Sequence, residues 1–155
     1  FWGPSTMFFG YTKPMSGRQT KTVLNPEQRE ALARGAIHFN GGRFFEAHEA
    51  WELRWRKLPL PDRPQVQAAI LVCGVFVLLG KGRIEPAARL ARLSLERFAE
   101  ASTAAKIYGL APALSLPGSE ERMVRILGRI ALGETDSTLL VLEAENLQAV
   151  VDGVP

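Results

Sequence analysis

The chain has 155 residues, of which 46% are hydrophobic and 23% charged, and it contains a single cysteine. This length and composition fit one ordinary globular domain with a real core, and one cysteine excludes an internal disulfide. Residues 1–24 carry three of the 19 basic groups and none of the 16 acidic ones, so the remainder holds sixteen of each and is neutral. A neutral domain lacks the basic stripe that phosphate binding needs, and we expect no nucleic-acid partner.

We expect residues 1–22 to be a flexible basic tail, because they are rich in Gly, Pro, Ser and Thr. Two alternatives stay open: the tail is not native to the domain, or it is an organelle-targeting segment. Residues 7–11 are too short an apolar cluster for a secretory signal, and Cys73 lies in an apolar run typical of a buried thiol in a reducing compartment. We therefore expect a cytoplasmic protein.

Residues 23–155 are predicted to form a single helical domain. An Asn-Pro-Glu-Gln sequence at 25–28 supplies a capping box and predicts a first helix to about Phe39. The Asn-Gly-Gly turn at 40–42 then leads into an antiparallel second helix over residues 43–57, which Pro59 and Pro61 end.

A third helix is predicted near residues 64–80, with an unbroken apolar run at 68–79. Such a run spans only about 18 Å, short of the roughly 20 residues that a bilayer requires, so we expect a central core helix and no membrane partner. Pro86 begins a predicted fourth helix, and Ser119 caps a fifth. Residues 139–142 and 147–151 fit either a short helix or an extended strap. The predicted fold is an all-α bundle of about five helices.

The second helix carries the candidate site. At about 100° per residue, His48 and Glu52 share a side with four aromatic residues, and Glu49 lies at its edge; the aromatic residues are Phe44, Phe45, Trp51 and Trp55. An i,i+4 His–Glu pair can hydrogen-bond directly and orient the imidazole, so His48 is a candidate general base assisted by Glu49 or Glu52.

Other interpretations of this face stay open. The His–Glu pair fits a satisfied structural network, and the aromatic residues fit a core wall. The candidates for lining a ligand pocket are His38, Glu46, Trp51, Trp55, Gln67 and Arg83. Two histidines and one cysteine do not match the spacing of the usual zinc or di-iron sites, so we expect no metal and no cofactor.

Residues 39–55 resemble the signature of the "domain of unknown function 309" family of small all-helical proteins. The Asn, Gly, aromatic, Glu, Ala, His-Glu and Trp positions of that signature appear in register, and the resemblance covers about residues 28–95. The resemblance implies an all-helical domain in a family without an established activity.

The third helix departs from the family pattern, because Leu71, Val77 and Leu78 stand where the family has polar residues, and Arg83 closes a Lys-Gly-Arg in place of Arg-Gly-Asn. Either this member has lost a ligand function, or its site uses the second helix with His38, Gln67 and Arg83.

The turn at residues 40–47 also resembles a tetratricopeptide-like hairpin, but the expected repeat about 34 residues later is absent.

Three classes of function therefore stand. The first is a helical-bundle protein whose polar cluster is structural or binds a small ligand. The second is a general-base or metal-assisted hydrolase-like enzyme using His48 with Glu49 or Glu52. The third is an interaction module or homo-oligomer.

Overall fold

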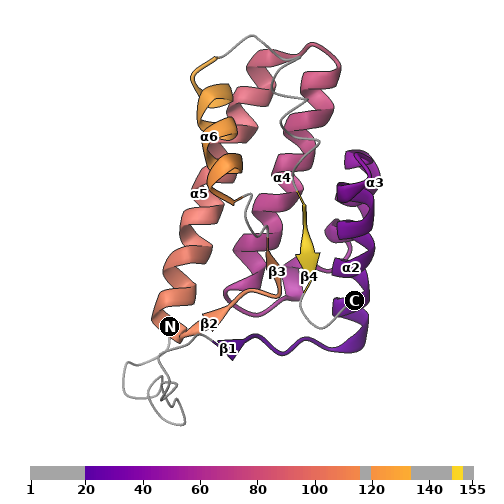
Figure 1. Cartoon of the computed structure of the whole chain (residues 1–155), viewed down its shortest axis with the longest axis vertical. Coiled ribbons are helices and arrows are strands. Elements are labelled where there is room, and N and C mark those ends of the chain that lie inside the picture. Colours follow the sequence, from indigo (N-terminus) through magenta and orange to yellow (C-terminus); the bar gives the residue numbers. More distant parts are fainter. Residues whose placement is uncertain (1–19, 116–119, 134–147, 152–155) are drawn as a thin grey trace.

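A computed structural model of the chain describes residues 20–115, 120–133 and 148–151 (Figure 1). Five α-helices make up most of this part: α2 (Pro26–Asn40), α3 (Phe44–Glu52), α4 (Asp62–Gly80), α5 (Ile84–Tyr108) and α6 (Glu120–Ala131). The short 3-10 helix η1 (Trp55–Lys57) follows α3, and the strands are β1 (Thr20–Lys21), β2 (Leu110–Ala111), β3 (Leu114–Ser115) and β4 (Val150–Val151). Because 73% of these residues are helical, the predicted all-α bundle is confirmed.

Local sequence signals set most helix ends. The Asn25 side chain accepts from the backbone N–H of Gln28 at 2.8 Å, and the Gln28 side chain accepts from that of Asn25 at 3.0 Å, which completes the predicted capping box. The second helix is shorter than predicted. It ends at Glu52 because Arg54 leaves the helical conformation (φ −128°), and the chain continues as η1, which packs Trp55 against the core.

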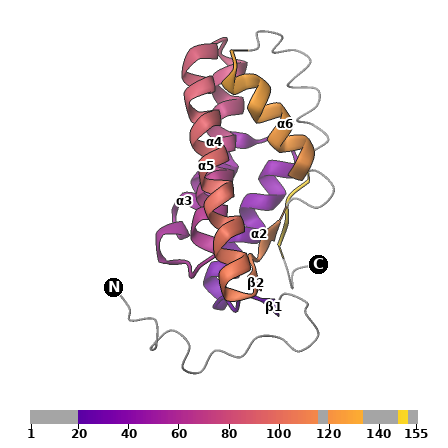
Figure 2. The same cartoon turned by 90° about the vertical axis from the view of Figure 1, so that its left-hand side faces the viewer.

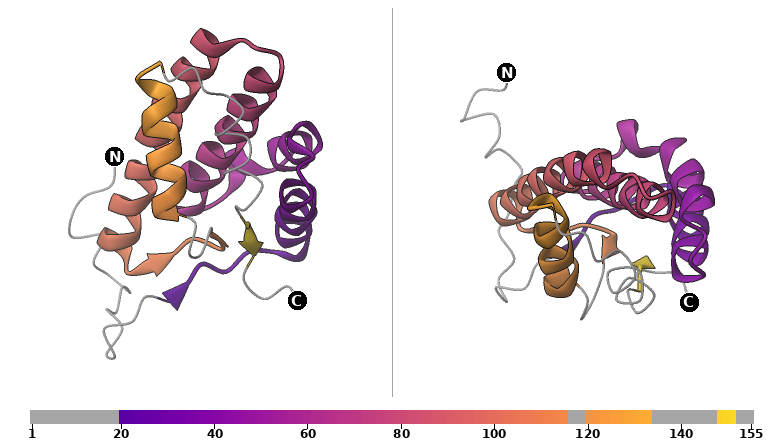
Figure 3. Two further views of the ribbon diagram at one scale, coloured as in Figure 1. Left: turned by 45° about the horizontal axis from the view of Figure 1, so that its top comes forward. Right: turned by 90° about the horizontal axis from the view of Figure 1, so that it is seen from above.

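Neighbouring helices in the sequence pack against each other, in the order α2, α3, α4, α5 and α6. Figures 1 and 2 show α4 and α5 along the long axis of the molecule, and the view from above in Figure 3 shows α5, α4 and α3 following one another in an arc. Both α4 and α5 bury small residues, such as Ala69 in α4 and Ala91 in α5. The C-terminal end of α6 is tied to α5, since Arg92 donates to the carbonyl of Ala131 at 2.7 Å.

The central helix α4 has the length and composition of a membrane span, with a mean hydropathy of 1.5. However, 61% of that apolar window is buried inside the protein, including Val66, Val72 and Cys73 at 0% exposure. This burial supports the predicted core helix.

The short strands join the ends of the described chain to the bundle. β1 pairs in parallel with β2, and Thr22 is buried, so the packed domain includes residues 20–22, which the sequence assigned to the tail. β3 pairs antiparallel with β4, so the described end of the C-terminal segment is an extended strap and not a helix. The rest of the predicted tail, the Ser119 cap and residues 139–147 lie outside the described residues.

Candidate functional site

The buried side of α3 is built around Trp51. Its indole N–H donates to the carbonyl of Leu32 in α2 at 3.0 Å, and the side chain is fully buried. The ring fits there because position 35 is glycine: a Cβ at Gly35 would lie within 2.5 Å of three indole atoms. The two small neighbours Ala47 and Ala50 are also buried, so α3 lies close to the bundle on this side. Trp51 therefore stabilises the hairpin of α2 and α3.

This packing corrects the predicted orientation of α3. Phe45 is 59% exposed and Glu52 is also exposed, so neither lies on the buried side with Trp51, although the sequence placed all three on one side of the helix. The buried residues of α3 are Ala47, Ala50 and Trp51, and the side chains at 45 and 52 lie outside this buried side. Phe44 remains on the packed side and contacts Phe39 and Phe76, with ring centroids 5.3 and 5.0 Å apart.

His48 lies at the edge of the buried side, with 36% of its side chain exposed. The ring stacks on Phe45 with centroids 6.3 Å apart, and Nδ1 lies 3.6 Å from Oε1 of Glu49. This distance is too long for a hydrogen bond, and the buried Nδ1 atom has no hydrogen-bond partner among the described residues.

Glu52 does not orient His48. Its Oε1 accepts instead from the indole N–H of Trp55 at 3.3 Å. The His48–Glu52 hydrogen bond that the sequence suggested is therefore not formed, and the other candidate partner, Glu49, has its Oε1 atom 3.6 Å from Nδ1 of His48.

The remaining predicted residues lie apart from a common cavity. His38 accepts from Arg43 Nε at 3.1 Å at the turn after α2, Glu46 is exposed on α3, and Arg83 is exposed at the turn before α5. Within the described ranges, no group of three or more His, Cys, Asp or Glu side chains could hold a metal ion.

Asn40 has a role that the sequence analysis missed. Its side chain accepts from the N–H of Ala149 at 2.6 Å and donates to the carbonyl of the same residue at 2.9 Å. Asn40 thus ties the C-terminal strap to the end of α2. No local signal reveals this role, because an Asn before two glycines also fits an ordinary helix end.

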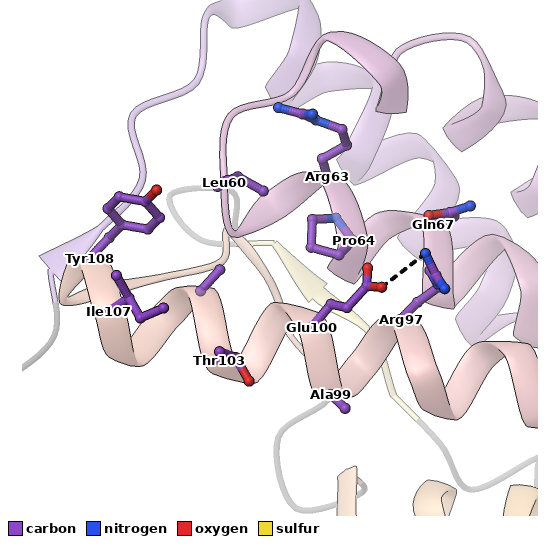
Figure 4. Close-up of a pocket in the computed structure, with 11 residues that line it drawn as sticks. Leu60, Arg63, Pro64, Gln67, Arg97, Ala99, Glu100, Thr103, Ile107 and Tyr108 are labelled. Carbon is purple, nitrogen blue, oxygen red and sulfur yellow. Dashed lines mark ion pairs between the residues drawn. The ribbon is translucent and has the colours of Figure 1, made fainter. Parts of the chain in front are cut away.

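A groove of about 640 Å³ lies between α4 and α5, away from α3 (Figure 4). One wall comes from the start of α4 and the preceding loop, and the other from the last turns of α5. The lining residues are Leu60, Arg63, Pro64, Gln67, Arg97, Ala99, Glu100, Thr103, Ala104, Ile107 and Tyr108. Of the residues that the sequence proposed for a pocket, Gln67 alone lines this groove.

The two ends of the groove differ, because one carries charged and amide side chains and the other carries Leu60, Ile107 and Tyr108 (Figure 4). Figure 4 shows Arg97, Glu100 and Gln67 together at one end, whereas Leu60 and Ile107 lie at the other. Arg97 pairs with Oε1 of Glu100 at 3.1 Å, one helical turn apart on α5. Leu60 and Ile107 are 37% and 59% exposed, which leaves apolar surface open to a ligand.

The groove could have been found in part from the sequence. Residues 97, 100, 103, 104, 107 and 108 recur at helical spacing, so a shared stripe on α5 was readable. Which part of α4 faces that stripe depends on how the two helices pack, and sequence spacing does not fix this.

The comparisons with known proteins give one family match, over part of the chain. No curated protein and no solved structure matches the chain. The family model described as "Domain of unknown function (DUF309)" matches residues 32–90, from within α2 to within α5. This agrees with the resemblance over about residues 28–95 that the sequence indicated. The α4 wall of the groove lies inside the match, and the α5 wall lies beyond it. The chain therefore carries a DUF309 domain at residues 32–90.

Proposed function

We propose that this helical domain binds a small amphipathic molecule in the groove between α4 and α5. The observation that carries the proposal is the groove itself, about 640 Å³ in volume, with a lining that combines apolar side chains with a few polar groups. Pockets that hold small ligands commonly have about 300–1,000 Å³ and this combination of apolar lining with few polar groups. The proposed role is binding, because the lining that the structure describes combines apolar side chains with a few polar groups.

For the polar cluster on α3 we propose a structural role. His48 stacks on Phe45, Glu52 accepts from the indole N–H of Trp55, and the indole N–H of Trp51 donates to the α2 backbone, so three side chains of this helix contact a nearby residue. Each contact involves a neighbour on α3, on η1 or on α2, as expected for groups that fix a helix hairpin.

A general-base role for His48 is the second candidate. The specific observation in its favour is the buried Nδ1 atom, which has no hydrogen-bond partner in the described part of the chain and has Glu49 at 3.6 Å. A metal-assisted version of this role would need ligands from outside the residues that the structure describes. Self-association, a cytoplasmic location and the absence of nucleic-acid and membrane partners stay predictions from the sequence.

The binding proposal is tested by closing the groove. Thr103 is exposed and lines it, so Thr103→Trp would fill the space without entering the core. Ser102 is the matched control, because it is exposed on the same turn of α5 and does not line the groove. The probe is 1-octanol, titrated into labelled protein and followed by amide chemical shifts.

We expect saturable shifts at groove residues in the wild type and in Ser102→Trp, and their loss in Thr103→Trp. Shifts that are equal in both variants, or absent from the wild type, would refute binding in this groove.

A further inference from the structure

The polar end of the groove contains a cation that is incompletely paired. Arg97 is 25% exposed, and its buried Nε has no hydrogen-bond partner among the residues that the structure covers. A guanidinium offers five N–H donors, and Glu100 engages it through NH1 at 3.1 Å. The Glu100 side chain is itself 52% exposed, and an ion pair of this kind on a helix surface is weak. A better placed anion could therefore displace Glu100 from Arg97.

The charges of the lining residues favour a monoanion. Arg63 and Arg97 contribute two positive charges, and Glu100 contributes one negative charge. Arg63 Nε is fixed on the carbonyl of Leu58 at 3.2 Å, so this side chain is anchored at the start of α4. Arginine pairs especially well with a planar carboxylate, because two parallel N–H donors match its two oxygens. The lining residues together carry a net charge of +1, which suits a single carboxylate better than a dianionic phosphate.

The end of the groove at Leu60 and Ile107 favours an apolar chain as the second part of the ligand. Figure 4 places Leu60 and Ile107 away from the guanidinium of Arg97, at the far end of the same groove. Both side chains are partly exposed, and burying such apolar surface under a ligand is favourable by about 25 cal/mol per Å². The basic segment at residues 1–24 is a poor occupant of this groove, because it carries Lys13, Arg18 and Lys21 and no acid.

From these observations we infer that the groove binds an amphipathic monocarboxylate, with its carboxylate on Arg97 in place of Glu100 and its apolar chain along Leu60 and Ile107. This inference rests on the proposed binding function of the groove and adds the chemical class of the ligand. Glu100 acts as an internal competitor that occupies the guanidinium when the groove is empty.

The experiment compares octyl compounds that differ in the head group, titrated into the full chain and followed by amide shifts. We expect octanoate to bind about tenfold more tightly than 1-octanol, and octyltrimethylammonium to bind more weakly than both. Arg97→Gln should abolish the advantage of octanoate over octanol. Glu100→Gln should do the opposite and strengthen octanoate binding about threefold or more, with little effect on octanol. Arg89→Gln is the matched control, because Arg89 pairs with Glu85 on α5 and does not line the groove.

The outcomes separate the inference from the binding function. If octanol binds as tightly as octanoate, or if Arg97→Gln leaves their ratio unchanged, the carboxylate assignment is wrong while binding in the groove stands. Tighter binding of octyl phosphate than of octanoate would also overturn the choice of a monocarboxylate. If neither octanol nor octanoate binds, both proposals fail. Weaker octanoate binding in Glu100→Gln would contradict the displacement of Glu100, and this variant tests it even if Arg97→Gln is unstable.

Discussion

Replacing Gly35 with alanine tests how α2 and α3 are joined. The added Cβ would lie within 2.5 Å of the indole atoms Nε1, Cδ1 and Cε2 of Trp51, closer than real Cβ atoms approach their neighbours. The indole is fully buried and its ring centroid lies 5.9 Å from that of Phe39, so it cannot move away freely. Any shift also strains the bond from Nε1 to the carbonyl of Leu32.

The expected loss of stability follows from three effects. Overpacking of a core costs about 1–3 kcal/mol, and a buried indole N–H left without its acceptor costs about 1–3 kcal/mol more. Alanine recovers about 1 kcal/mol relative to glycine inside a helix. We therefore expect Gly35→Ala to lower the free energy of unfolding by about 3 kcal/mol.

Urea unfolding followed by far-ultraviolet circular dichroism measures this change. Gly128→Ala is the matched control, because Gly128 lies inside α6 and an added Cβ there meets nothing within 4 Å. The control should be neutral or more stable than the wild type by up to about 1 kcal/mol. If Gly35→Ala is as stable as the control, the close packing of Trp51 on Gly35 is refuted.

Further predictions concern the strap, the exposed carboxylate and the thiol. Asn40→Ala removes both hydrogen bonds to Ala149 and should lower the free energy of unfolding by about 1–3 kcal/mol, with faster hydrogen exchange at the Ala149 amide. Unchanged exchange at this amide would contradict the proposed role of Asn40 in holding the C-terminal strap. Glu52→Ala should change stability by no more than about 0.5 kcal/mol, because Glu52 is exposed, and a much larger loss in a urea titration would mean that it supports the core after all. Burial raises the pKa of the Cys73 thiol far above its usual range, so the reactive thiolate is disfavoured in the folded protein. Iodoacetamide should then label Cys73 in urea and not in buffer at mildly alkaline pH, and rapid labelling of the native protein would count against this burial.

The sequence predicted the fold well because most of its signals are local. The capping box at Asn25, the glycine turn after α2 and the apolar run of α4 each act within a few residues, and each appears in the structure where it was expected. The resemblance of residues 39–55 to a known signature also located the domain.

The candidate site was predicted less well, because it depends on packing between helices. Helical spacing placed Phe45 and Glu52 on the same side as Trp51, whereas Ala47 and Ala50 are the residues buried beside Trp51 in the structure. The space that Gly35 of α2 leaves for the Trp51 ring of α3 depends on how these two helices pack. The sequence of either helix alone does not reveal it. For the same reason the groove was missed: Arg97 and Leu60 come together only when α4 and α5 are packed in their actual register.

The central claim is that the groove between α4 and α5 holds an amphipathic carboxylate, and chemical-shift mapping with octanoate tests it most directly. We predict that the largest amide shifts fall on groove residues such as Gln67, Glu100 and Ile107, and that the Arg97 Nε–H signal shifts with them. Shifts centred on His48 and Glu49 of α3, with none along α5, would contradict the claim and favour ligand binding at His48.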